Sequence, residues 1–443
     1  MADGAADPRL RRIGSKGRRW RGTAGRSAVV VLAGAGLLAT SAPAAGATDA
    51  PAAPYRVAAG GARTADGARK ADGAALDAVV RAMVREGGAA ATLARVRENG
   101  STAWKGAAGV ADLATGAPAD PDGRFRIGSV TKTFVATVVL QLVAEHRLGL
   151  DDSVESRLPG VVRNGAGITV RQLLNHTSGI HDFTEDPAFD AGNEATLRQW
   201  LAGGRWTSYR PQQLVDIADK YPRYFAPGQG WHYSNTDYVL VGMIIERLTG
   251  RSWAQEVDRR IIRPLGLTGT SMPIDSPFIP GSHAHGYYKL ATGPADVTLL
   301  NPSMASSAGA GISTTADLTR FISALLGGQL LGPAELAEMK RTSGPGETVG
   351  YGLGLQRMTT PCGEFWGHSG GIPGYNTLLV GEVTGKRQFA TSINRYDLSD
   401  PAAMQRTSND LYSTGTCGGR QPAASPSALP SAAATPRSTG PLT

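Results

Sequence analysis

The spacing of hydrophobic residues predicts a β-hairpin and then a long helix in the first part of the chain. Apolar and polar positions alternate in residues 91–97 and 101–107, and Asn99-Gly100 separates the two runs. Alternation around an Asn-Gly pair is typical of a hairpin closed by a tight turn. Apolar residues then recur at helical spacing, which predicts an amphipathic or buried helix that begins near Ser129. They are Phe134, Val135, Val138, Val139, Leu142 and Val143.

The hydrophobic pattern changes twice more along the chain. Between about residues 150 and 300, short helical patterns alternate with turns rich in Pro, Gly and Asn. Strand patterns return after about residue 350 and precede a last helix over 401–412. This order predicts a mixed α/β (α+β) fold, in which an antiparallel sheet built from both ends of the chain is flanked by helices and interrupted by the mostly helical region. The predicted internal helices are 169–175, 235–249 and 253–262, and the late strands are 351–358, 364–368, 376–383 and 387–394.

Both ends of the chain are predicted to lie outside this folded unit of residues 76–418. A basic segment, an apolar run and two Ala-x-Ala steps follow one another in residues 1–47, which is typical of a secretory signal peptide. Residues 48–75 form an Ala/Gly-rich linker, and residues 419–443 form a disordered tail rich in Pro, Ala and Ser. We therefore expect a secreted, extracellular protein without a stable membrane anchor, because the apolar run is too short to span a bilayer.

Composition and charge narrow the classes of function. Of the 443 residues, 41% are hydrophobic and 19% are charged, which excludes a largely disordered chain, a coiled coil and a polytopic membrane protein. The formal net charge of +8 would suggest nucleic acid as a partner. Residues 1–27, however, hold eight basic and two acidic residues, so most of the surplus belongs to the export signal. We expect no nucleic-acid partner, and we expect a monomer.

The first motif with hydrolase chemistry is Ser129-Val-Thr-Lys132, at the start of the predicted long helix. Positions i and i+3 share one helical face, so the Lys132 amine can reach the Ser129 hydroxyl. A serine hydroxyl needs a base, and a desolvated lysine can have a pKa low enough to act as one. The start of a helix also directs backbone N–H groups toward a developing oxyanion.

Two further motifs follow in the sequence. In Tyr233-Ser-Asn235, a tyrosine near a lysine amine can shuttle protons, and the asparagine can orient the lysine or hold a substrate amide. Ser234 and Asn235 would also suit an ordinary helix cap. The third motif, His368-Ser369-Gly370, ends a predicted strand, where small residues let a peptide-like substrate approach the strand edge.

In this order the three motifs resemble the Ser-x-x-Lys, Tyr-x-Asn and His-(Thr/Ser)-Gly set of penicillin-recognising serine hydrolases. The chain is most similar to the secreted actinomycete D-alanyl-D-alanine carboxypeptidases of the class C β-lactamase-like group, over about residues 76–418. Residues 125–132, 168–174, 233–236, 350–355 and 367–370 carry the resemblance.

The resemblance implies a role for each residue of the first two motifs. Ser129 would attack the substrate carbonyl and form an acyl-enzyme, while Lys132 and Tyr233 would share the proton transfers. Asn235 would position Lys132 and a substrate amide. The resemblance implies no metal ion and no organic cofactor.

The third motif would bind substrate along the strand edge, through His368, Ser369, Gly370 and Gly371. His368 stands where β-lactamases commonly have a lysine and would keep that edge polar. The backbone N–H groups of Ser129 and Gly371 would form the oxyanion hole.

Three positions depart from these carboxypeptidases. Gln356 stands where they carry an Arg that grips the substrate's terminal carboxylate, and the adjacent Arg357 would face the other side of a strand. Gly371 replaces a Thr after the third motif, and Met304 replaces a Trp of the pocket. An uncharged Gln gives a weaker hydrogen bond than an Arg, so another acyl substrate becomes plausible.

The two cysteines, Cys362 and Cys417, most simply form one disulfide in an exported protein. The alternative is two buried free thiols. The trailing tail and this cysteine pair also resemble the carboxypeptidase group.

Three other stretches imitate functional motifs. Residues 367–371 match the Gly-x-Ser-x-Gly elbow of α/β-hydrolases, but no histidine follows His368 to serve as its base. Residues 174–179, Leu-Asn-His-Thr-Ser-Gly, are interpreted as a structural loop. His283 and His285 lack a third ligand for a metal ion and are interpreted as surface or turn residues.

The sequence thus favours a secreted D-alanyl-D-alanine carboxypeptidase that acts on peptidoglycan stem peptides and is acylated by β-lactam antibiotics. A β-lactamase, an esterase and a D-amino-acid peptidase or amidase on the same fold remain alternatives. A non-enzymatic binding protein would have lost Ser129 or Lys132, and both are present.

Overall fold

The computed structural model describes residues 73–189, 194–344, 349–360 and 362–418. The predicted signal peptide, most of the linker and the predicted tail therefore lie outside the described residues. Helix α1 begins at Gly73, three residues before the expected start of the folded unit. Within the described ranges, no helix is both long enough and apolar enough to cross a bilayer.

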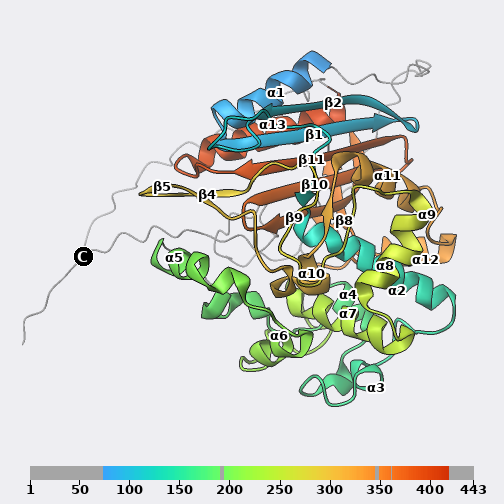
Figure 1. The fold of residues 1–443 in the computed structure, drawn as a ribbon. Coiled ribbons are helices and arrows are strands. Elements are labelled where there is room, and N and C mark those ends of the chain that lie inside the picture. The colour runs from blue at the N-terminus through green and yellow to red at the C-terminus, as the bar shows by residue number, and fades with distance from the viewer. Residues whose placement is uncertain (1–72, 190–193, 345–348, 361, 419–443) are drawn as a thin grey trace, which may run out of the picture.

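A seven-stranded antiparallel sheet forms the upper half of the molecule in Figure 1. Its strand order is β2-β1-β11-β10-β9-β8-β7, so the N-terminal hairpin pairs directly with the last strand of the chain. This confirms the expected sheet built from both ends of the sequence. The strands are β1 (Ala89–Glu98), β2 (Ser101–Gly109), β7 (Val349–Tyr351), β8 (Gln356–Thr360), β9 (Gly363–Ile372), β10 (Tyr375–Glu382) and β11 (Arg387–Arg395).

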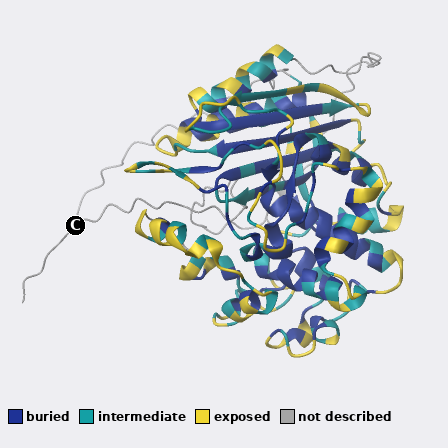
Figure 2. Cartoon of the chain, in the orientation of Figure 1, coloured by how far each residue is buried: buried dark blue, intermediate teal, exposed yellow. Residues whose placement is uncertain are grey.

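Both faces of this sheet are covered. Helices α1 (Gly73–Arg85) and α13 (Pro401–Cys417) pack together on one face and enclose a smaller core with Val96, Phe389 and Leu411. Helix α11 (Thr315–Leu326) packs on the other face, where the larger core continues into the helical half. Figure 2 shows that the central strands and the helices just below them are largely buried, while the outer helices are partly exposed.

The helical half contains the predicted insertion and surrounds α2 (Thr131–Ala144). Helix α2 is buried continuously from Thr131 to Leu140, so it is the central buried helix rather than an amphipathic one. The other helices are α3 (Val154–Arg157), α4 (Val170–Leu174), α5 (Glu194–Ala202), α6 (Pro211–Ala218), α7 (Asn235–Thr249), α8 (Trp253–Val257), α9 (Arg263–Leu265), α10 (Ser306–Gly309) and α12 (Pro333–Met339). Two short strand pairs join β3 (Phe125–Arg126) to β6 (Ile312–Ser313) and β4 (Tyr287–Leu290) to β5 (Gly293–Asp296).

The structure divides one predicted strand, residues 351–358, into β7 and β8. A tight turn separates them, in which the Gly352 N–H donates to the Leu355 carbonyl at 2.8 Å. Gly354 has a φ of +69°, and a Cβ there would lie 2.5 Å from the Cβ of Ala136 on α2. The turn therefore depends on a close approach to α2, which local hydrophobic pattern does not reveal.

The two cysteines form a disulfide, as predicted. Cys417 at the end of α13 is joined to Cys362, just before β9, and their Cα atoms are 5.5 Å apart. The bond ties the helix that covers one face of the sheet to the strand that carries the third motif.

Candidate active site

The turn that carries Ser129, the predicted nucleophile, lies where α2 meets β9. A single 3-10 turn, Gly128–Val130, leads into α2 at Thr131, so the helix begins slightly later than predicted. Gly128 has a φ of +50°, and a Cβ there would lie 2.8 Å from the backbone nitrogen of Gly371. A Cβ on Gly370 would lie 2.0 Å from the Ile127 carbonyl oxygen. Glycines in both segments thus let β9 press directly against the turn that holds Ser129.

This contact bears on the expected oxyanion hole. The same imaginary Cβ of Gly370 lies 3.0 Å from the Ser129 backbone nitrogen. The peptide groups of Ser129 and Gly371 are therefore neighbours, as a site with two backbone donors requires.

The Lys132 amine is held by three oxygen atoms. Its Nζ lies 3.0 Å from Ser129 Oγ, 2.7 Å from Asn235 Oδ1 and 2.8 Å from the carbonyl oxygen of Ala308 on α10. The side chain has no solvent exposure. Burial lowers the pKa of Lys132 to about 7, although the nearby carboxyls of Asp182 and Asp237 oppose this effect.

Tyr233 lies beside the same amine. Lys132 Nζ is 4.8 Å from the centre of the Tyr233 ring, and the tyrosine is almost completely buried. Burial raises the pKa of Tyr233 well above its usual value, and interaction with the Ser129 hydroxyl only partly offsets this rise. The Tyr233 hydroxyl has no hydrogen bond of good geometry within the described part of the chain, so its proton remains available to a substrate atom.

Asn235 links Lys132 to a residue that sequence reasoning missed. It is the first residue of α7, and its Nδ2 donates to Asp182 Oδ2 at 2.9 Å while its Oδ1 faces Lys132. The other Asp182 oxygen accepts the Thr184 N–H at 3.0 Å. Asp182 thus fixes which way the Asn235 amide faces.

The third motif presents its histidine side chain and its glycine backbone to different neighbours. The His368 side chain has no solvent exposure, and its ring centre lies 6.4 Å from that of Tyr233. Its Nε2 is 2.9 Å from the Tyr351 hydroxyl, and its Nδ1 is bonded to the Ser369 carbonyl. Burial lowers its pKa to about 3, so the ring is neutral. The His368 ring thus lies on the side of Tyr233 and Tyr351, whereas the backbone of Gly370 and Gly371 lies against the turn that holds Ser129.

Gln356 and Met304 are two of the three positions that depart from the carboxypeptidases. The Gln356 Oε1 accepts the backbone N–H of Ser369 at 3.0 Å and lies 3.4 Å from its hydroxyl. Gln356 is therefore held against the third motif across the β8–β9 pair. Met304 is half-buried in the 3-10 turn Pro302–Met304, which leads into α10 and its Lys132-binding carbonyl.

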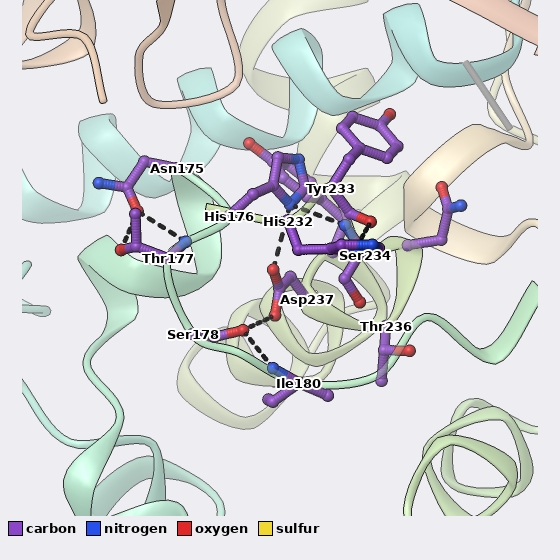
Figure 3. Close-up of polar contacts among 12 residues, drawn as sticks. Asn175, His176, Thr177, Ser178, Ile180, His232, Tyr233, Ser234, Thr236 and Asp237 are labelled. Atoms are coloured by element: carbon purple, nitrogen blue, oxygen red, sulfur yellow. Dashed lines mark hydrogen bonds and ion pairs between the residues drawn. The ribbon is translucent and has the colours of Figure 1, made fainter. Parts of the chain in front are cut away.

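The loop at residues 174–179 lies under the second motif, which sequence reasoning did not predict. His176 contacts Asp237 and the Ser234 backbone, and its ring centre is 4.3 Å from that of Tyr233 (Figure 3). The only sequence signal was the Leu-Asn-His-Thr-Ser-Gly run itself. In the parts of the chain that the structure describes, no three His, Cys, Asp or Glu side chains are grouped to hold a metal ion.

Comparison with known proteins agrees with this geometry. The family model described as Beta-lactamase matches residues 76–411, which is most of the chain. The chain belongs to the beta-lactamase family. The predicted family resemblance is confirmed, together with the mixed fold.

Within the beta-lactamase family, two curated relatives differ in their named activities. Penicillin-binding protein 4* of Bacillus subtilis (strain 168) is 31% identical over 305 residues, which cover 64% of this chain and 63% of that protein. The chain thus spans less than two thirds of that relative's length. Esterase EstB of Burkholderia gladioli is 30% identical over 328 residues, which cover 63% of this chain and 78% of the esterase.

Solved structures of the beta-lactamase fold include two similar proteins whose names give a D-stereospecific or D-amino-acid activity. A D-stereospecific amidohydrolase from a Streptomyces species is 41% identical with a TM-score of 0.70, over 78% of this chain and 99% of that one. The D-amino acid amidase of Ochrobactrum anthropi SV3, in complex with D-phenylalanine, is 28% identical with a TM-score of 0.66, over 77% and 98% of the two chains.

Proposed function

We propose that this hydrolase forms an acyl-enzyme on Ser129 and cleaves amides or esters whose acyl group is a D-amino acid. The observation that carries the mechanism is the 3.0 Å contact between Ser129 Oγ and the buried Lys132 amine. A lysine whose pKa is about 7 is partly neutral at neutral pH, and only the neutral amine can accept the serine proton.

Acylation begins when Ser129 Oγ attacks the substrate carbonyl carbon and its proton passes to Lys132 Nζ. The carbonyl oxygen becomes an oxyanion, which accepts hydrogen bonds from the backbone N–H groups of Ser129 and Gly371. Tyr233 gives its proton to the leaving nitrogen or oxygen and recovers one from the Lys132 ammonium. The bond to the leaving group then breaks and the acyl-enzyme remains.

Deacylation repeats these transfers with water. A water molecule attacks the ester carbon of the acyl-enzyme and passes one proton to the neutral Lys132 amine, directly or through the Tyr233 hydroxyl. The Lys132 ammonium then returns this proton to Ser129 Oγ as the acyl group leaves. Asn235 and Ala308 hold the lysine amine in place through both steps, because each gives it an oxygen partner within 2.8 Å.

Gln356 supports a D-amino-acid amide or ester in preference to a peptide with a free carboxylate. It stands where the resembled carboxypeptidases have an Arg, and its oxygen is already bound to the Ser369 N–H. A neutral amide offers no ion pair to a terminal carboxylate. The similarity to the Streptomyces D-stereospecific amidohydrolase, which covers nearly all of that chain, points the same way.

D-alanyl-D-alanine carboxypeptidase activity on peptidoglycan stem peptides is the second candidate. It is favoured by the order of the three motifs and by the similarity to penicillin-binding proteins. We further propose that the protein is secreted, on the basis of the signal-peptide pattern of residues 1–47 and the disulfide.

Mass spectrometry after incubation with penicillin or a p-nitrophenyl ester tests the proposal. We expect one covalent adduct, located on Ser129, and no adduct in Ser129→Ala. Full ester hydrolysis by Ser129→Ala would overturn the mechanism. Turnover of D-amino-acid amides, D-Ala-D-Ala peptides, simple esters and cephalosporins, measured side by side, then ranks the acyl substrates.

A further inference from the structure

A buried hydrogen-bonded chain connects the loop at residues 174–179 to the segment that carries Tyr233. The Ile180 N–H donates to Ser178 Oγ at 3.0 Å, and the Ser178 hydroxyl donates to Asp237 Oδ1 at 2.6 Å. The second oxygen of Asp237 lies 3.1 Å from His176 Nδ1 (Figure 3). The side chains of His176 and Asp237 have no solvent exposure.

His176 is bonded to the backbone on both sides of Tyr233. The His232 N–H donates to the His176 carbonyl at 3.1 Å, and the Ser234 N–H donates to His176 Nδ1 at 3.3 Å. The residues before and after Tyr233 are thus both bonded to His176, whose ring also packs against the phenol. His176 adopts a φ of +62°, an uncommon conformation for a residue other than glycine.

The Ser234 bond determines where the proton of this group lies. A ring nitrogen that accepts a backbone N–H presents a lone pair and cannot carry a hydrogen of its own. The Asp237 oxygen faces the same nitrogen, and two lone pairs do not attract each other. The carboxyl must therefore supply the hydrogen, and the neutral ring carries its own proton on Nε2.

We propose that Asp237 is a neutral carboxylic acid that donates to His176 Nδ1, and that this uncharged pair is a positioning unit for Tyr233. A carboxylate in the first turn of a helix is ordinarily ionised, because the helix N-terminus favours negative charge. Here the Ser178 hydroxyl donates to one Asp237 oxygen and the His176 Nδ1 lone pair accepts from the other, so the protonated acid satisfies both of its partners. The Nε2–H of His176 has no hydrogen-bond partner among the described residues.

The surroundings agree with an uncharged pair. Burial raises the pKa of Asp237 well above its usual value, and burial also holds the pKa of His176 well below its own. Other titratable or charged groups face the pair from the elements around it. They are Lys132 on α2; Asp182, Arg223 and His232 in loops; Tyr233 just before α7 and Tyr238 within it; Tyr351 on β7; and His368 on β9.

Asp182 and Asp237 have different hydrogen-bond partners. Both oxygens of Asp182 accept N–H groups, from Thr184 and Asn235, which is the arrangement of an ionised carboxylate. Burial raises the pKa of Asp182 too, but its bonds with Thr184 and Asn235 and the nearby Lys132 ammonium oppose that rise. On this proposal the site contains one charged and one uncharged buried carboxyl. Both carboxyls lie close enough to favour the Lys132 ammonium when ionised, and with Asp237 uncharged only Asp182 is left as its counter-charge.

Nitrogen NMR of the ¹⁵N-histidine-labelled protein tests the proton assignment without any substrate. We expect His176 to carry its proton on Nε2 from about pH 6 to 9, with Nδ1 unprotonated. His368 is the internal control, because its Nδ1 donates to the Ser369 carbonyl and its Nε2 accepts from Tyr351, the opposite tautomer. His176→Asn assigns the signal, since Asn tolerates a positive φ. A protonated Nδ1 on His176 would overturn the proposal.

Kinetics with a p-nitrophenyl ester test the positioning role. Asp237→Ala should lower kcat by about tenfold or more with KM changed less than about threefold, because a Tyr233 proton transfer is impaired and no substrate contact is removed. Asp237→Asn should recover most of that kcat, since its amide N–H replaces the acid O–H. Equal effects of Ala and Asn, or a loss confined to KM, would contradict the proposal.

The pH profile separates a neutral Asp237 from an ionised one. Asp237→Asn should leave the midpoint of the kcat/KM profile in place, whereas Asp182→Asn should lower it by about one pH unit because Lys132 loses a counter-charge. A comparable downward shift in Asp237→Asn would mean that the carboxyl is ionised. This inference rests on the proposed acyl-enzyme for its kinetic readouts only. Failure of Ser129 acylation would remove the proposed function, while a reversed His176 tautomer would remove this inference alone.

Discussion

Lys132 Nζ lies 3.0 Å from Ser129 Oγ, and the Lys132 side chain has no solvent exposure. Three oxygen partners surround the amine, and only one of them, Ser129 Oγ, is the proposed nucleophile. The amine is therefore fixed in place before a substrate arrives, so the lysine needs no rearrangement to accept the serine proton.

The first prediction concerns pH. Because burial lowers the pKa of Lys132 to about 7, kcat/KM should rise with pH through a midpoint near that value as the ammonium loses its proton. The activity is lost on the acidic side, where Lys132 is charged and cannot act as a base. A pH–rate profile with an ester substrate measures this midpoint, and a flat profile across the neutral range would contradict the assignment.

Replacing the base itself gives a second prediction. Lys132→Met should lower kcat/KM by about 10³-fold, within the range that general-base catalysis supplies. Lys132→Arg serves as the matched control: it keeps the positive charge but stays protonated, so it should be equally inactive. Substantial activity in the Arg variant would show that charge, not proton acceptance, is what Lys132 provides.

Asn235 provides a third prediction. Asn235→Ala removes the bond to Lys132 and leaves the Asp182 carboxyl without its amide partner. Loss of a hydrogen bond to a charged group costs about 1.5–3 kcal/mol, so kcat/KM should fall roughly 10- to 100-fold. Steady-state kinetics and a thermal melt of the same variant would separate this effect from unfolding. Thr249→Ala is the control, because it changes the other end of α7 and so shows how a change in this helix affects stability away from the site.

Gln356 gives a prediction about substrate choice. Gln356→Arg should raise the turnover of peptides with a free terminal carboxylate relative to that of an ester without one, because an Arg can pair with the carboxylate. Gln356→Met is the control, since it loses the bond to Ser369 and adds no charge. An unchanged ratio in the Arg variant would mean that Gln356 does not face the leaving-group side of the substrate.

The contact between β9 and the nucleophile turn gives a prediction about stability. Gly370→Ala places a Cβ 2.0 Å from the Ile127 carbonyl and should destabilise the fold by about 1–3 kcal/mol or abolish acylation. Gly167→Ala is the control, because no atom lies within 4 Å of a Cβ there. Urea unfolding and labelling of Ser129 by a β-lactam measure both effects, and a fully active, equally stable Gly370→Ala protein would contradict the packing.

The sequence indicated the proposed catalytic side chains more completely than the buried residues that hold them in place. Ser129 and Lys132 share one helical face, so spacing alone brings them together. The interactions of Asp182 with Asn235 and of Asp237 with His176 join residues more than 50 positions apart. No local pattern encodes such contacts, because they depend on how α7 packs against the loops around it.

The strand predictions failed where tertiary contacts decide the conformation. The turn between β7 and β8 exists because Gly354 meets α2, and the inward direction of His368 depends on Tyr351 as a buried partner. A strand pattern shows which residues alternate but not which face will be covered. Because helices cover both faces of this sheet, the complete burial of the polar His368 side chain does not follow from its place at the end of a strand pattern.

The pairing of β1 with β11 also determines when the enzyme can first act. Ala91 lies opposite Asn394, about three hundred residues later in the chain, and β9 supplies an edge of the site. Contacts this distant in sequence form late and slow folding. A nascent chain that already contains Ser129, Lys132 and Tyr233 but lacks β11 therefore cannot yet form the complete sheet and its site. Hydrolysis can begin only after synthesis has passed the final strands, so an incomplete chain is harmless to acyl compounds in the cell that makes it.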